Sequence, residues 1–203
     1  MKKVLAFICA VTIVSVAFAG CGNESANVNL NSTTETTINI KDESKTHLKN
    51  AYNNLIYVNS ELEAVSSTIQ EAWYYGIFED NCSLAGLSSE IGIPVSEFEK
   101  IGLSNFDVYD FTSCVVAVCK VYQSNGKFSD IKSNLDNAKS EIQSATDDID
   151  NYEDMKNYYS SCLAYYDWLQ YPGGNFNQFT DTINQYNIEL NGYKNDLEFD
   201  YGQ

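Results

Sequence analysis

Apolar residues recur at helical spacing through most of this chain. The longest series lies between Phe128 and Tyr171, about 44 residues that contain neither proline nor glycine. Its apolar positions follow one another in steps of three and four: Ile131, Leu135, Ala138, Ile142, Ala145, Ile149, Tyr152, Met155, Tyr159, Cys162, Tyr166 and Leu169. Steps of this kind place side chains on one face of a helix, so we predict one long amphipathic helix here. A stripe of that length cannot be buried by itself, and other helices must therefore pack along it.

A second series runs through residues 44–78. Its apolar positions form an uninterrupted heptad: Ala51, Leu55, Val58, Leu62, Val65, Ile69 and Ala72. A heptad favours near-parallel packing of long helices, as in a coiled coil. We expect Asp42 or Ser44 to cap the start of this helix and Gly76 to mark its end.

A third series, between Phe176 and Leu197, predicts the last helix. It follows Tyr171-Pro172-Gly173-Gly174, where a proline and two glycines stop the preceding helix. Asn175 with Gln178 three residues later is typical of a helix start. Because the connecting loop is short, the two helices that it joins are expected to be antiparallel neighbours.

The segment between the first and the long helix, residues 82–123, divides into two halves. Residues 109–122 are strongly apolar and fit a buried helix or a buried strand, but no second strand is visible to pair with them, which favours the helix. Gly126 can end that helix in the left-handed conformation. Residues 83–101 predict two short helices joined at Gly92, a small helical cap over one end of a bundle.

The first 21 residues have the pattern of a targeting segment. Two lysines precede an uncharged apolar run, Val4–Phe18, that is too short to cross a membrane comfortably. The run ends in Phe18-Ala19-Gly20-Cys21, which resembles the lipobox of bacterial lipoproteins. The resemblance implies that residues 1–20 are a signal peptide and that Cys21, acylated by fatty acids such as palmitate, anchors the protein to the bacterial cell membrane, facing outside the cytoplasm. The alternative is an ordinary secretory signal cleaved near Gly20.

The rest of the chain then divides into a tether and one domain. Residues 21–43 are rich in Asn, Ser and Thr without a clear period, which is typical of a flexible tether. Residues 44–203 form the helical bundle domain. We predict an all-α fold: an elongated antiparallel helical bundle with long coiled-coil-like helices and a small helical cap. The first helix rises from the tether, the buried helix descends, the long helix rises and the last helix descends.

The charge of the chain excludes two classes of partner. The formal charge is −16, no arginine occurs, and removal of residues 1–20 with their two lysines and no acids makes it −18. So acidic a surface repels nucleic acid and bare anionic lipid headgroups. Residues 87–98 resemble the turn of helix-turn-helix DNA-binding proteins, but the second helix would offer DNA Glu97 and Glu99 beside Lys100. We expect no nucleic-acid partner.

The candidate metal ligands are few. Four cysteines remain in the mature chain: Cys82, Cys114, Cys119 and Cys162. An even number outside the cytoplasm permits two disulfides, but three of the four lie in predicted helices with apolar surroundings, which favours buried free thiols. No CxxC spacing occurs, and the one histidine, His47, is expected at the solvent edge of the first helix. We therefore expect no metal.

Catalytic motifs are equally scarce. Residues 147–154 gather five carboxylates and resemble a calcium loop, but they lack its turn glycine and its final glutamate. We interpret them as a solvated face of the long helix. No nucleophile elbow, phosphate-binding loop or histidine-based constellation is found, so the sequence predicts no enzyme and no cofactor.

Aromatic residues from three segments are expected to meet at the end of the bundle farthest from Cys21. They are Trp73, Tyr74 and Tyr75, then Tyr165, Tyr166, Trp168 and Tyr171, and beyond the hairpin Phe176 and Phe179. Aromatic bodies with polar tips give a large contact area at little entropy cost, so this end is a candidate site for a protein, peptide or sugar. The alternative is that these residues are the core of the bundle itself.

Two function hypotheses follow from this pattern. The first is a non-enzymatic interaction or spacer module at the cell envelope. The second is a small-molecule receptor that serves a transporter or sensor through a pocket between the helices. A receptor needs an enclosed apolar pocket with a few converging polar groups, whereas a spacer or adhesion bundle should be packed solid.

Overall fold

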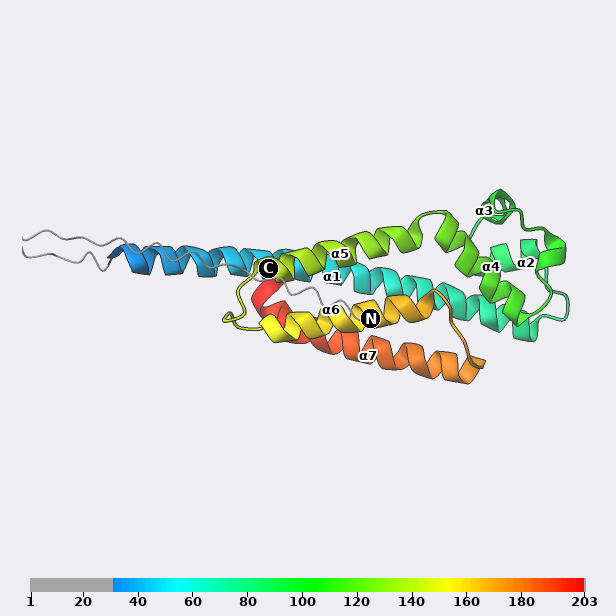
Figure 1. The fold of residues 1–203 in the computed structure, drawn as a ribbon. Coiled ribbons are helices and arrows are strands. Elements are labelled where there is room, and N and C mark those ends of the chain that lie inside the picture. Colours follow the sequence, from blue (N-terminus) through cyan, green and yellow to red (C-terminus); the bar gives the residue numbers. More distant parts are fainter. Residues whose placement is uncertain (1–30, 203) are drawn as a thin grey trace, which may run out of the picture.

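The computed structural model describes residues 31–202, with side chains from Ile40 onward, and every regular element in this range is helical (Figure 1). The elements are α1 (Asn31–Phe78), α2 (Leu84–Ile91), α3 (Val95–Lys100), the 3-10 turn η1 (Asn105–Asp107), α4 (Phe111–Ser124), α5 (Lys127–Ser144), α6 (Tyr152–Leu169) and α7 (Phe176–Tyr201). The prediction of an all-α fold is confirmed. None of the helices within residues 31–202 combines the length and the hydropathy that a membrane span requires.

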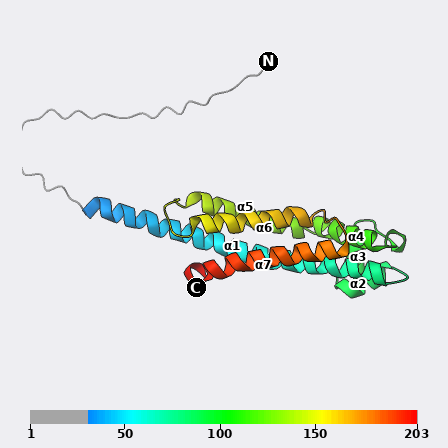
Figure 2. The same cartoon turned by 90° about the horizontal axis from the view of Figure 1, so that it is seen from below.

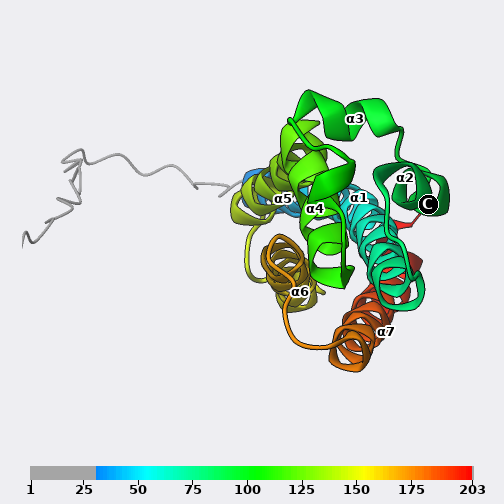
Figure 3. The same cartoon turned by 90° about the vertical axis from the view of Figure 1, so that its right-hand side faces the viewer.

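The bundle is organised along α1, which contacts α2, α4, α5, α6 and α7. The other long helices lie beside it, and its N-terminal part extends past them (Figures 1 and 2). We call the end of the bundle where α1 finishes and α2 and α3 pack the distal end. The opposite end, with the α5–α6 loop and the C-terminus of α7, is the proximal end. Figure 3 looks along the bundle from the distal end and shows α4 between α3 on one side and α7 on the other.

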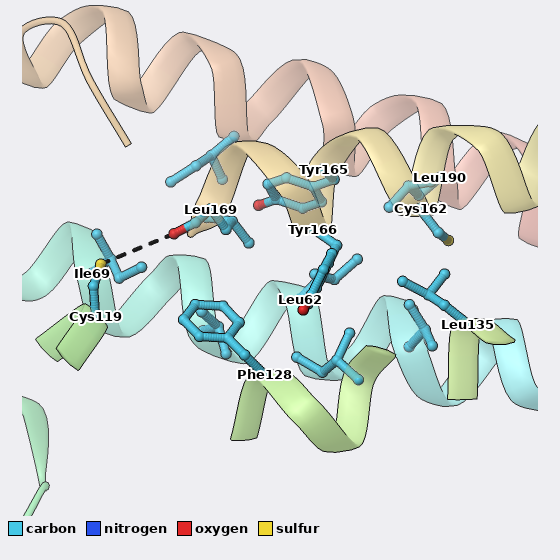
Figure 4. Packing of buried hydrophobic residues seen from close by; sticks show 14 of the residues in the cluster. Leu62, Ile69, Cys119, Phe128, Leu135, Cys162, Tyr165, Tyr166, Leu169 and Leu190 are labelled. Carbon is cyan, nitrogen blue, oxygen red and sulfur yellow. Dashed lines mark hydrogen bonds between the residues drawn. The ribbon is translucent and has the colours of Figure 1, made fainter. Parts of the chain in front are cut away.

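The heptad on α1 forms the centre of the core, a place that the sequence analysis gave to the series in residues 128–171. All seven of its residues are completely buried: Ala51, Leu55, Val58, Leu62, Val65, Ile69 and Ala72. Side chains of α5 and α6, including Phe128, Leu135 and Leu169, pack against them (Figure 4). Burial of one such aliphatic side chain contributes about 1.5–3 kcal/mol, so this stripe explains why long helices gather around α1.

The prediction of one long helix over residues 128–171 is wrong, because the chain breaks it into α5 and α6. After Ala145 leaves the helix in an extended conformation, Asn151 adopts a left-handed conformation with φ 66°. The intervening residues are rich in Asp, whose side chains compete with helical hydrogen bonds. Ile149 in this loop is nonetheless buried, which is why the apolar series appeared continuous.

The course of the chain differs from the expected one for the same reason. α4 and α5 both run from the distal end towards the proximal end, α6 returns to the distal end, and α7 runs back again (Figures 1 and 2). Only the second half of the predicted long helix therefore rises. The end of α6 still reaches the end of α1, as the sequence analysis expected.

The first helix begins earlier than expected. It starts at Asn31, within the segment expected to be a tether, so neither Asp42 nor Ser44 caps it. Ser44 is instead buried, and its hydroxyl lies 3.2 Å from both the backbone N and Oγ1 of Thr146 in the α5–α6 loop. The hydroxyl therefore ties the reversal between α5 and α6 to the central helix.

Other local predictions are confirmed. Residues 111–124 are helical and not a strand, and Gly126 follows them in the left-handed region with φ 91°. Gly92 ends α2 in the same region with φ 71°. At the start of α7 the backbone N–H of Gln178 donates to Asn175 Oδ1 at 3.0 Å, and that of Asn175 donates to Gln178 Oε1 at 3.1 Å. This reciprocal pair is a capping box.

Candidate binding surface

The aromatic groups of α1, α6 and α7 meet at the distal end. Ring centroids of Trp73 in α1 and Phe179 in α7 are 4.8 Å apart, and those of Trp168 in α6 and Phe179 are 5.0 Å apart. Phe111 at the start of α4 also stacks on Trp73, with 6.1 Å between centroids and 6° between ring planes. These rings join four helices at one place.

Most of the candidate binding residues belong to the core. Trp73, Tyr75, Tyr165 and Tyr166 are buried, and Trp168 is half-buried. The two exposed members are Tyr74, with 51% of its surface accessible, and Tyr171, with 79%. The buried members therefore follow the alternative stated above: their rings form part of the core of the bundle.

Stacked rings occupy the interface of α6 and α7. Tyr165 stacks on Tyr186 with 4.5 Å between centroids and 12° between planes, and Tyr158 stacks on Tyr193 at 6.0 Å. Burial raises the pKa values of Tyr158 and Tyr165, so both phenols stay protonated over the physiological range. This interface is filled by side chains, which is the packing expected of a spacer or interaction bundle rather than of a receptor with a pocket between these helices.

Exposed aromatic side chains surround the buried ones. The ring of Tyr74 lies 4.4 Å from that of Phe78 and 6.3 Å from that of Phe176, measured between centroids. Phe78 is 61% exposed, and Ile77 beside it is also exposed. Apolar side chains that remain accessible next to one another commonly mark an interaction surface.

A surface cleft lies between α4 and the α6–α7 loop. It has a volume of about 320 Å³ and is lined by Val115, Val116, Cys119, Lys120, Gln123, Gln170, Tyr171 and Pro172. A neighbouring cleft of about 180 Å³ shares three of these residues and extends to Trp73 and Phe111. Together the two clefts form a groove along α4, which we call the distal groove. It joins the buried aromatic cluster to the exposed Tyr171.

Local hydrogen bonds fix the side of the groove that α4 provides. Asp110 Oδ1 accepts from the backbone N–H of Ser113 at 2.8 Å, while Ser113 Oγ accepts from the backbone N–H of Asp110 at 2.9 Å. One turn earlier, hydrogen bonds from Ser104 lower the pKa of Asp107, which keeps this carboxylate ionised. The Asp110–Ser113 pair defines where α4 begins and so places Phe111 and Val116 at the groove, while the Ser104–Asp107 pair caps η1.

The groove offers shape and apolar contact rather than reactive groups. Its polar side chains are Lys120, Gln123 and Gln170 in the larger cleft, the Tyr171 hydroxyl beside them, and Thr112 in the smaller cleft. Cys119 forms part of its floor, where its thiol donates a weak hydrogen bond to the Leu169 carbonyl at 4.0 Å (Figure 4). Burial raises the pKa of this thiol to about 12, so it carries a proton at neutral pH and is a poor nucleophile.

Sequence reasoning missed three residues of this surface: Phe78, Phe111 and Val116. A usable signal existed for Val116, because it lies in a run of five consecutive apolar residues between Cys114 and Val118, and a helix cannot bury all of its faces when it packs on one side. Val116 is 43% exposed. Phe78 and Phe111 gave no such signal, since their exposure depends on where the cap packs.

The remaining candidate residues have structural surroundings. His47 is half-buried at the edge of the bundle, as expected, and its Nδ1 lies 2.6 Å from Glu141 Oε2. The acidic residues 147–150 lie in the α5–α6 loop and not on a helix face. Among the described residues, no group of three or more His, Cys, Asp or Glu side chains is placed to hold a metal ion. Cys21, the expected lipid attachment site, lies outside the described residues.

The chain was compared with protein-family models, with curated proteins and with solved structures. No family model matches it, no curated protein matches it, and no solved structure matches it.

Proposed function

We propose that the protein is a non-enzymatic, lipid-anchored interaction module of the bacterial cell envelope. In this proposal acylated Cys21 holds the chain at the membrane, and the distal groove binds a polypeptide partner. The observation that carries the proposal is the gathering of exposed aromatic and aliphatic side chains at the distal end. That end is opposite to the one at which α1 enters the bundle.

The length of α1 supports a presenting role. Its 48 residues correspond to about 70 Å at 1.5 Å per residue. Trp73, which lines the groove, lies 42 residues after Asn31, so a chain anchored before Asn31 would hold this part of the groove about 60 Å along the helix axis from the start of α1. Such a separation suits a surface that meets a partner away from the membrane.

The charge around the groove specifies the chemistry of the partner. Residues 71–120 and 165–182, which build the distal end, contain ten carboxylates and two lysines. A partner with excess positive charge would be attracted to this end and oriented by it. The occupant we propose is therefore a basic polypeptide segment that places apolar side chains into the groove.

The lining of the groove favours a polypeptide over a sugar. Valine, proline and the buried Cys119 make up much of its wall. A sugar presents many hydroxyl groups that need hydrogen-bond partners, and so few polar side chains in one cleft serve that purpose poorly. Aliphatic and aromatic side chains of a peptide match such a wall well.

In-cell photocrosslinking tests the proposal with a matched control. A photoreactive amino acid is placed at Tyr171 in one full-length variant and at Phe199 in another. Phe199 is 84% exposed but lies near the end of α7 at the proximal end. We expect a protease-sensitive adduct from position 171 and none from position 199. No adduct at position 171, equal adducts at both positions, or an adduct that is glycan and not protein would overturn the proposal.

A pair of charge variants tests the chemistry of the partner. Val116→Lys and Val116→Glu both introduce a long charged side chain at an exposed position of the groove. If the partner is basic, the lysine variant should reduce the adduct at position 171 several-fold more than the glutamate variant. An equal reduction would contradict a basic partner. Only the proposed position of the binding surface, at the distal groove, would then stand.

A further inference from the structure

Two cysteines bracket the cap of the bundle. Cys82 lies four residues after the end of α1 and just before α2, and Cys114 lies in the first turn of α4. Between them is the whole cap, residues 83–113, with α2, α3 and η1. A covalent bond between these cysteines would close the cap into a loop anchored at its base.

The two thiols are neighbours. The Cys82 side chain lies beside that of Cys114, close enough for a hydrogen bond between the thiols to contribute to the raised pKa of Cys114, which reaches about 12 mainly through burial. Cys82 Sγ also lies 3.7 Å from the carbonyl oxygen of Glu79, which places this thiol against the end of α1. Both cysteines are free thiols in the structure.

The two helices next to the cysteines in sequence are in direct contact. A Cβ added to Gly76 in the last turns of α1 would lie 2.3 Å from the Cα of Phe111, the first residue of α4. The end of α1 and the start of α4 therefore meet without side chains between them. This contact holds α4, which carries Cys114, against the end of α1, four residues before Cys82.

The cap packs unevenly on the bundle: Leu84, Leu87 and Ile91 of α2 are buried, whereas α3 and η1 bury little. η1 has no buried residue, and the only buried side chain of α3 is Phe98. Phe106 and Tyr109, in and just after η1, are 92% and 72% exposed. The α3–η1 part of the cap therefore has few buried contacts to hold it, and a cross-link between the two ends of the cap would limit how far this part can open.

We propose that Cys82 and Cys114 form a disulfide that locks the cap onto the bundle when the protein meets an oxidised dithiol. The proposal rests on the proposed location outside the cytoplasm, where such oxidants maintain disulfides. The oxidant is another disulfide, such as that of an oxidised thiol–disulfide oxidoreductase or oxidised glutathione.

The reaction balances as two thiol–disulfide exchanges. Cys82 is the more accessible thiol, so its thiolate attacks one sulfur of the oxidant, forming a mixed disulfide and releasing the other sulfur as a thiolate. Cys114 then gives its proton to the released group and attacks the Cys82 sulfur. This step releases the second half of the oxidant as a thiolate, which takes up from solvent the proton that Cys82 lost on ionisation. The two cysteines are oxidised by two electrons, and the oxidant disulfide is reduced to two thiols.

The other two cysteines serve as internal controls. Cys119 is in α4 and Cys162 is in α6, both are buried, and they face different parts of the core (Figure 4). Cys119 points to the Leu169 carbonyl and not to a thiol. Both are therefore expected to remain thiols under oxidising conditions.

Thiol mapping tests the pairing. The purified full-length chain is reduced, incubated with oxidised glutathione, denatured and alkylated, and its peptides are analysed by mass spectrometry. We expect one cross-linked pair of peptides that contain Cys82 and Cys114, two hydrogens lighter than the separate peptides, and alkylated Cys119 and Cys162. Alkylation of all four cysteines, or a different pairing, would overturn the proposal.

The effect on stability supplies a second measurement. Closing a loop of about 30 residues should raise the melting temperature of the oxidised protein by roughly 5–10 °C over the reduced protein. Cys82→Ser, at a half-buried position, should abolish the difference between oxidised and reduced protein, whereas Cys119→Ala should preserve it. A redox-dependent difference that survives in Cys82→Ser would contradict the pairing.

The same mapping on protein isolated from cells separates the pairing from the location. If the disulfide forms in the purified chain but both thiols are free in protein alkylated directly in cells, the location outside the cytoplasm is wrong and the pairing stands. If the purified chain fails to form it, the pairing is wrong whatever the location.

Discussion

Gly76 of α1 and Phe111 of α4 touch through their backbones: a Cβ on Gly76 would lie 2.3 Å from the Phe111 Cα and 2.7 Å from its N. The obstacle is backbone, which cannot rotate away as a side chain can. Glycine is therefore required here by the close approach of two helices. The approach places Phe111 on Trp73 and so builds one wall of the distal groove.

Gly76→Ala should lower stability by about 1–3 kcal/mol, because the added methyl group must push α4 away from α1. The melting temperature would fall by several degrees in thermal unfolding followed by circular dichroism. Gly192→Ala is the matched control, since Gly192 is also helical but a Cβ there meets nothing within 4 Å. It should raise stability by up to about 1 kcal/mol. Equal effects of the two changes would contradict the close approach.

Ile142→Asp should cost several kcal/mol, because it buries an unpaired charge at a position where the isoleucine is only 4% exposed. For a domain of ordinary stability this is enough to unfold much of the protein. Asp148→Ala, in the exposed α5–α6 loop, should be nearly silent. Chemical denaturation of both variants decides the point, and a wild-type midpoint for Ile142→Asp would mean that the inner face of α5 is not core.

Stability should fall as the pH rises above about 10. Burial raises the pKa of Tyr158 well above the ordinary value of about 10 that the unfolded chain would show, so alkali ionises the unfolded state first. The contribution of Tyr158 is fully present below pH 10 and decreases by about 1 kcal/mol by pH 11. Tyr158→Phe should flatten this part of the stability curve, whereas Tyr171→Phe, at an exposed position, should not. Identical slopes for both variants would show that Tyr158 is not the titrating group.

Cys21→Ala should release the protein from membranes or block its processing, as the resemblance of residues 18–21 to a lipobox implies. Metabolic labelling with a radioactive fatty acid measures this directly. Wild-type protein should take up label and Cys21→Ala should not. Absence of label in wild type would refute the lipid anchor, and the proposed function would then lose its membrane attachment.

The sequence predicted the fold where the signal was local. The heptad of α1 and the capping box of Asn175 and Gln178 depend on spacing alone, and both were correct. The break between α5 and α6 was missed because it depends on distant contacts. Thr146 is bonded to Ser44, 102 residues away, and the hydroxyl of Tyr201 donates to the Asp150 carbonyl at 3.2 Å.

The candidate site was predictable only in part. The meeting of Trp73, Trp168 and Phe179 follows from the direction of α1, α6 and α7, which the loop signals indicate. The sequence does not show which aromatic residues stay exposed. Tyr74 and Tyr75 are adjacent in sequence, and only Tyr75 is buried. Its hydroxyl accepts from the Ser83 N–H at 3.1 Å, a contact that exists only once the chain has turned back after α1.

The long α1 also has a mechanical consequence. A load that enters the chain before Asn31 and leaves through a partner on the distal groove would pull α1 along its own axis. Because α1 packs on α2, α4, α5, α6 and α7, such a force would have to slide α1 past all five helices at once. The contacts could not break one after another. The bundle should therefore resist stretching in shear, as a rigid strut between an anchor and whatever it holds.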